Sequence, residues 1–176
     1  VSRVRITGGE PLVRKGLPDL VRAVSRLDGV KDFSMTTNAG LLERFAKDLK
    51  RAGLRRINIS LDSLRHDRFR EITRGGDLST VLSGIDKALD VGLITVKINM
   101  VEMRGVNDDE LVEFVKFAAK RHIKLRFIEG MPLGRIGFLN KEMYMPSEEI
   151  AENIAREYPL SPSGGDGAGP ARYYRV

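Results

Sequence analysis

The chain of 176 residues contains no cysteine and no tryptophan, and only two histidines. Without cysteine it can form no disulfide and no cysteine-ligated metal or iron–sulfur site. It has no apolar run of the ~20 residues that a membrane span needs and no visible signal peptide, so we expect a cytoplasmic location and no membrane partner. Aromatic residues make up only 6% of the chain. Despite the net charge of +6, this scarcity argues against a nucleic-acid-binding surface.

Apolar periodicity predicts strands alternating with helices along the chain. The expected strands cover about 2–7, 32–38, 56–62, 94–101 and 123–129, and the expected helices about 17–27, 41–49, 78–89, 108–121 and 147–158. This alternation indicates βαβ units and a parallel sheet. For the helix near 108–121, Asn107 and Glu110 form a capping-box pattern. The segment 161–170 is rich in glycine, proline and serine and predicts a loop.

The expected strands have one apolar and one polar face, whereas parallel strands buried on both sides are usually apolar throughout. A complete eight-stranded barrel packs its interior with branched apolar side chains. The pattern therefore favours an incomplete, wider barrel with a polar interior. The cations on this face are Arg3, Arg5, Lys97, Lys124 and Arg126, and Asp62 is the one acid that we expect there.

This excess of positive charge predicts a ligand class. Burying several cations without counterions is costly, because desolvation and mutual repulsion add, and a polyphosphate would relieve both. The alternative is that Arg5 and Lys97 form salt bridges with Asp62 or Glu129.

The segment Arg3–Pro11 predicts a strand that runs into a glycine-rich turn. Gly8 and Gly9 allow a close approach of the backbone to a ligand, although a plain strand-to-helix turn would use the same residues. Six segments that include this turn occur in order along the chain and carry a family resemblance. They are Ile6–Arg14, Met35–Asn38, Asn58–Leu64, Val96–Val101, Arg126–Gly134 and Gly169–Tyr174. Together they resemble the radical S-adenosylmethionine enzymes and, within them, the GTP 3′,8-cyclase family of molybdenum cofactor biosynthesis.

The resemblance implies an α/β fold, a partial (βα)6 TIM-like barrel of which strands two to six are present. It divides the chain into a barrel core, 1–160, and a loop, 161–176, leading into a further region. Val1 lies almost at the start of the strand expected at about 2–7, and Tyr173–Val176 predicts the beginning of another strand, so we expect the chain to be a piece of a longer protein.

The resemblance also implies the chemistry and its residues. A 4Fe–4S cluster would reduce S-adenosylmethionine, and the resulting 5′-deoxyadenosyl radical would start the conversion of GTP to 3′,8-cyclo-7,8-dihydro-GTP. The residues implied to bind S-adenosylmethionine are Gly9, Glu10, Ser60 and Met131. Those implied to bind GTP are Arg5, Thr36 and Lys97. No residue of the chain is implied to be a metal ligand or a catalytic group.

The chain departs from the family in lacking both cysteine triads that hold the 4Fe–4S clusters. We therefore expect the parent protein to be the enzyme and this chain alone to be inactive. Two alternatives remain open: a radical S-adenosylmethionine enzyme with another substrate, and a non-catalytic nucleotide-binding barrel. A homodimer is also left open.

Overall fold

The computed structural model describes residues 1–130, 141–164 and 171–176. Five parallel strands form one sheet in the order β1-β2-β3-β4-β5, which confirms the expected α/β fold with a parallel sheet. The strands are β1 (Arg3–Ile6), β2 (Asp32–Thr37), β3 (Arg56–Ser60), β4 (Thr95–Glu102) and β5 (Lys124–Glu129). Because the spatial order follows the chain order, each strand is added beside the preceding one.

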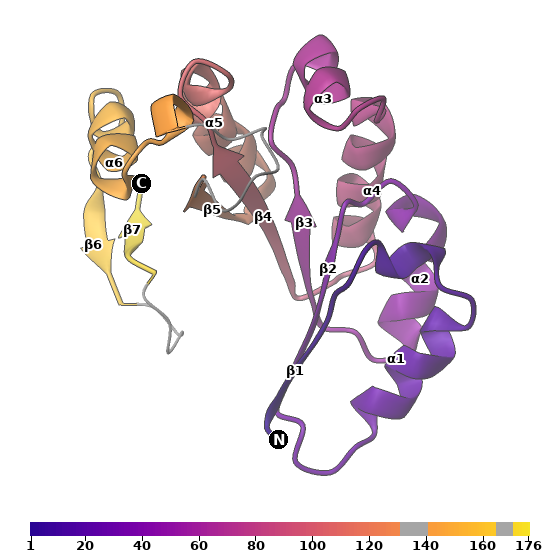
Figure 1. Ribbon diagram of the computed structural model, residues 1–176. Coiled ribbons are helices and arrows are strands. Elements are labelled where there is room, and N and C mark those ends of the chain that lie inside the picture. The colour runs from indigo at the N-terminus through magenta and orange to yellow at the C-terminus, as the bar shows by residue number, and fades with distance from the viewer. Residues whose placement is uncertain (131–140, 165–170) are drawn as a thin grey trace.

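Helices connect the strands and cover one side of the sheet. They are α1 (Leu17–Ser25), α2 (Leu42–Arg51), α3 (His66–Ile72), α4 (Leu78–Asp90), α5 (Leu111–Arg121) and α6 (Ser147–Ala155), with 3-10 turns η1 (Pro11–Val13), η2 (Asp108–Glu110) and η3 (Lys141–Met143). Figure 1 shows α1, α2 and α4 stacked along the same side of the strands. None of the described helices is long and apolar enough to cross a bilayer.

The apolar strand face forms the core beneath these helices. Met35, Ile57, Ile59, Ile98 and Met100 are completely buried there, as the alternation predicts. Burying such side chains contributes roughly 1.5–3 kcal/mol each, so this face drives the packing of the helices. The polar strand face takes no part in this core.

The packing of α2 against α4 depends on Gly84. A Cβ at this position would lie 2.9 Å from the carbonyl oxygen of Ala39 and 3.0 Å from the Cβ of Leu42. Both distances are shorter than ordinary van der Waals contact. A side chain at this point would therefore push the two helices apart.

The capping box expected at the start of α5 is wrong. The side chain of Asn107 makes no capping bond, and the residue is completely buried. Its Oδ1 accepts a hydrogen bond from Met103 N (2.8 Å), and its Nδ2 donates to the carbonyls of Asp62 (2.7 Å) and Val101 (2.9 Å). Asn107 thus joins the ends of β3 and β4, because buried backbone groups there need partners more than the helix does.

The expected loop at 161–170 is also partly wrong. Ser161–Ser163 forms β6, which pairs antiparallel with β7 (Tyr173–Arg175). Pro162 lies opposite Tyr174 in this two-stranded sheet, where proline is tolerated because each strand is an edge. The strand expected to begin near 173 is confirmed, and the division of the chain at 160/161 stays a prediction.

Candidate functional site

The polar strand face brings together four of the predicted binding residues. Thr36 on β2 lies opposite Asn58 on β3, which lies opposite Lys97 on β4. Ser60 follows Asn58 on the same face of β3, and Arg5 lies on the corresponding face of β1. Arg5, Thr36, Ser60 and Lys97 therefore project from one face of four neighbouring strands.

The cations of this face converge on Lys97. Its pKa falls from 10.5 to about 8 because the amine is partly buried and because four other cations, Arg126, Arg56, Lys124 and Arg5, repel its charge. These four residues come from β5, β3 and β1. An ammonium group that is repelled by several neighbouring cations is stabilised when an anion binds beside it.

Two residues of the polar face extend what the sequence predicts. Arg56 and Asp32, at the start of β3 and β2, form an ion pair of 2.9 Å between Nη1 and Oδ1. The prediction of Asp62 as the one acid is therefore wrong. Asp32 and Arg56 continue the polar alternation by one more position at the start of β2 and of β3. The sequence pattern therefore contained the signal for both residues, although the prediction did not include them. The polar face of the described strands then carries six cations, Arg3, Arg5, Arg56, Lys97, Lys124 and Arg126, and one acid, Asp32. Asp62, the second acid, follows two residues after the end of β3.

The acids considered as partners for Arg5 and Lys97 are used elsewhere. Oδ1 of Asp62 accepts a hydrogen bond from Val101 N at 2.8 Å, and burial raises the pKa of this carboxyl. Glu129 accepts from Ser147 N (2.8 Å). Within the described residues, neither carboxylate forms an ion pair with Arg5 or Lys97, so the charges of these two side chains stay available to a ligand.

The glycine-rich loop after β1 leaves room for a ligand. Gly8 has a φ of 144°, a conformation that side chains rarely adopt. A Cβ built on Gly9 meets no atom within 4 Å. The backbone of Gly9 is therefore bordered by open space, as expected where a small molecule approaches the main chain.

Glu10 tethers this loop to the end of β2. Its Oε1 accepts hydrogen bonds from Leu12 N (2.9 Å) and Thr37 Oγ1 (2.6 Å), and its Oε2 accepts from Asn38 N (2.7 Å). The Glu10 carboxylate thus fixes the position of the glycine-rich loop by anchoring it to the end of β2. Met131, the fourth residue predicted for S-adenosylmethionine, lies outside the described residues.

A buried carboxylate, missed by the sequence reasoning, holds the loop after β3 that follows Ser60. Glu110 is completely buried. It accepts hydrogen bonds from Ser63 Oγ (2.8 Å), Leu64 N (2.6 Å) and Arg68 Nη1 (2.6 Å). The partners lie more than 40 residues away in the chain, so no local pattern reveals this role.

The donor set of the site suits a nucleotide better than a metal. No group of three or more His, Cys, Asp or Glu side chains in the described residues is arranged to hold a metal ion. Since the chain also has no cysteine, it does not fit a 4Fe–4S cluster. The open space beside Gly9 and the exposed Ser60 hydroxyl do fit S-adenosylmethionine.

Comparisons with known proteins agree with this geometry. The family model of the radical SAM superfamily matches residues 1–118. A GTP 3′,8-cyclase of Alkaliphilus oremlandii is 46% identical over 176 residues, which cover 100% of this chain and 54% of that protein. Another, of Marinobacter nauticus, is 48% identical and covers 99% of this chain and 53% of that protein. The chain thus spans about half the length of the curated relatives that it matches.

Solved structures show the same fold at lower identity. A domain of pyruvate-formate lyase-activating enzyme from Bacteroides vulgatus aligns with a TM-score of 0.67 and 18% identity, over 87% of this chain and 90% of that one. Coproporphyrinogen III oxidase from Escherichia coli, a radical SAM enzyme, aligns with a TM-score of 0.66 and 15% identity, over 89% of this chain and 39% of that one. From the family match over more than half of its length, this homologue of GTP 3′,8-cyclases belongs to the radical SAM superfamily.

Proposed function

We propose that the chain is the ligand-binding core of a GTP 3′,8-cyclase, an enzyme of molybdenum cofactor biosynthesis that takes GTP and S-adenosylmethionine. The observation that carries the proposal is the convergence of cations around Lys97, whose pKa is lowered to about 8 by burial and by these cations together. The relatives named GTP 3′,8-cyclase support the same ligands. In this proposal the sheet corresponds to strands two to six of a partial (βα)6 barrel.

GTP binds to the cationic part of the polar face. Arg5 and Lys97 bind its phosphates. Neither side chain has an acidic ion-pair partner within the described residues, and a triphosphate supplies the negative charge for both. Thr36, opposite Asn58 in the sheet register, adds a hydroxyl for a polar group of the nucleotide. Asn58 orients Thr36, since its Nδ2 lies 3.5 Å from Thr36 Oγ1.

S-adenosylmethionine binds at the carboxyl ends of the strands. The backbone of Gly9 and the hydroxyl of Ser60 bind it, Glu10 holds the glycine loop, and Met131 contacts its adenosine. When bound beside a 4Fe–4S cluster, this cofactor supplies the radical that family members use. The chain holds no thiolate, so its own residues position the two ligands, and we propose that it binds them without catalysing the reaction.

A phosphate series measured by isothermal titration calorimetry tests the GTP site. We expect the affinity of the chain to fall in the order GTP, GDP, guanosine, and to weaken as salt rises, because charge pairs carry the binding. Guanosine binding as tightly as GTP would contradict the proposal.

The lack of cysteine favours one second candidate, a nucleotide-binding barrel without radical chemistry. Such a protein keeps the cationic face but has no need of a site for S-adenosylmethionine. Titration with S-adenosylmethionine separates the two functions: the cyclase core binds it in addition to GTP, whereas the binding barrel takes GTP alone.

A further inference from the structure

One acceptor on the polar face has no donor. Asn99 lies on β4, and its Oδ1 is buried without a hydrogen-bond partner in the described part of the chain. Buried side-chain oxygens are normally paired, because an unpaired buried acceptor has lost its bonds to water without gaining others. The other buried oxygens in this state belong to Asp32, which forms the ion pair with Arg56, and to Glu102. Glu102 lies on the opposite face of β4, with Met100.

The sheet register defines the surroundings of Asn99. Ser60 on β3 and Arg126 on β5 are its direct neighbours across the strands, and Lys97 precedes it on the same face of β4. A hydroxyl, an amide and a guanidinium group thus stand in one row. Although the neighbours are rich in donors, none of them bonds to Asn99 Oδ1, so this acceptor lacks a donor within the described part of the chain.

We propose that Asn99 Oδ1 accepts a hydrogen bond from an ammonium or hydroxyl group of S-adenosylmethionine, which makes Asn99 a further binding residue of this site. The inference rests on the proposed function above. Ionised phosphate oxygens only accept hydrogen bonds, so the triphosphate group of GTP, which we place beside Lys97, cannot satisfy this oxygen. S-adenosylmethionine carries an α-ammonium group, two ribose hydroxyls and a cationic sulfonium. The direct neighbour of Asn99, Ser60, is proposed to bind the same molecule.

Two substitutions separate this role from a merely structural one. Asn99→Leu keeps a similar volume but removes the acceptor, and we expect the Kd for S-adenosylmethionine to rise about 10-fold or more with the Kd for GTP nearly unchanged. Asn99→Asp keeps the acceptor and adds a negative charge between Lys97 and Arg126. We expect it to retain S-adenosylmethionine and to bind GTP about 10-fold more weakly, because the carboxylate competes with the phosphates for these cations.

The experiment is isothermal titration calorimetry on the 176-residue chain, with circular dichroism to verify that each variant is folded. Thr95→Val, on the same face of β4 but farther from Ser60, is the matched control and should change neither Kd by more than about 2-fold. 5′-Methylthioadenosine keeps the ribose hydroxyls but lacks the amino-acid group. If Asn99→Leu weakens S-adenosylmethionine alone, the donor is the ammonium, and if it weakens both equally, the donor is a ribose hydroxyl.

The results that would overturn the inference are distinct from those that would overturn the proposed function. If the unsubstituted chain binds GTP and S-adenosylmethionine but Asn99→Leu loses neither, the inference on Asn99 fails and the proposed function stands. Equal losses of both ligands in a folded Asn99→Leu variant would also overturn it. If Asn99→Leu does not fold, loss of S-adenosylmethionine binding in Asn99→Asp would refute it. An unsubstituted chain that binds neither ligand ends both proposals.

Discussion

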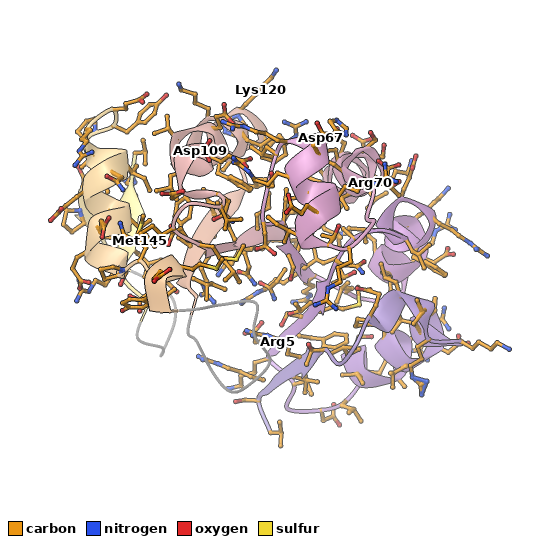
Figure 2. All side chains as sticks on the ribbon, turned by 45° about the horizontal axis from the view of Figure 1, so that its top comes forward. Arg5, Asp67, Arg70, Asp109, Lys120 and Met145 are labelled. Carbon is orange, nitrogen blue, oxygen red and sulfur yellow. The ribbon has the colours of Figure 1, made fainter. Side chains whose placement is uncertain are left out.

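Lys97 on β4 and Lys124 on β5 are register partners, so two lysines leave the same face of adjacent strands. Like charges directly opposite each other destabilise a sheet, and Lys124 is one of the cations that lower the pKa of Lys97. Arg5, from the far edge of the sheet, adds to the same repulsion. Figure 2 shows Arg5 well apart from Asp67, Arg70 and Lys120, which lie on the outer helices. The arrangement is one that an anionic ligand would stabilise.

Lys97→Ala should weaken GTP binding about 10-fold or more, because it removes a desolvated charge from the phosphate site. Binding of S-adenosylmethionine should stay largely intact. Titration calorimetry with each ligand measures both effects, and the exposed Lys120→Ala is the control for a lost surface charge. Equal loss of both ligands would count against the assignment of Lys97.

The affinity for GTP should depend on pH in a defined direction. Since the pKa of Lys97 is about 8, the amine loses its proton as pH rises through 8, and GTP should bind more weakly at pH 9 than at pH 7. At pH 8.5 binding should take up protons, which titrations in buffers of different ionisation enthalpy detect. Lys97→Arg, whose charge persists, should remove this dependence. Unchanged proton uptake in that variant would assign the titration to another group.

Glu110→Ala should lower the free energy of unfolding by about 2–4 kcal/mol, because Ser63, Leu64 N and Arg68 would lose their buried acceptor. Urea unfolding followed by circular dichroism measures the loss. Glu113→Ala, at an exposed position of α5, should cost less than about 1 kcal/mol. Similar costs for the two variants would show that the contacts of Glu110 contribute little to stability.

Glu102 should make stability depend on pH. It is completely buried, neither carboxylate oxygen has a partner in the described part of the chain, and burial, with Asp108 and Glu149 nearby, raises its pKa from 4.5 to about 7. The folded state therefore holds a proton that the unfolded state loses above pH 4.5, so this group makes stability fall as pH rises from 4.5 to 7.

The matched variant for this prediction is Glu102→Gln, which cannot ionise. At pH 8 it should be more stable than the unsubstituted chain by roughly 2–3 kcal/mol, and the two should be nearly equal at pH 4.5. Thermal unfolding across this range measures the difference. A constant difference at all pH values would mean that ionisation of Glu102 is not the cause.

Alternation of apolar and polar residues was enough to predict the five strands and which side chains share a face. That pattern is local, since neighbouring side chains on a strand point to opposite sides, so the convergence of Arg5, Thr36, Ser60 and Lys97 follows from it. Helix α3 escaped prediction because it spans seven residues and buries Phe69 alone, too few apolar positions to show a period.

Residues whose partners lie far along the chain could not be assigned. Asn107 and Glu110 have the spacing of a helix cap, yet their side chains bind backbone groups after β3 and near the end of β4. Buried acceptors elsewhere in the fold outweighed the local preference. The unpaired oxygen of Asn99 is likewise visible only once three strands are placed side by side.

The tether between Glu10 and the amide of Asn38 makes the glycine loop and the end of β2 behave as one unit. When the loop is held by a ligand, this amide proton is shielded with it, and when the loop opens, the proton becomes free to exchange with solvent deuterium. Exchange of this one amide proton thus reports whether the glycine loop is held against the end of β2.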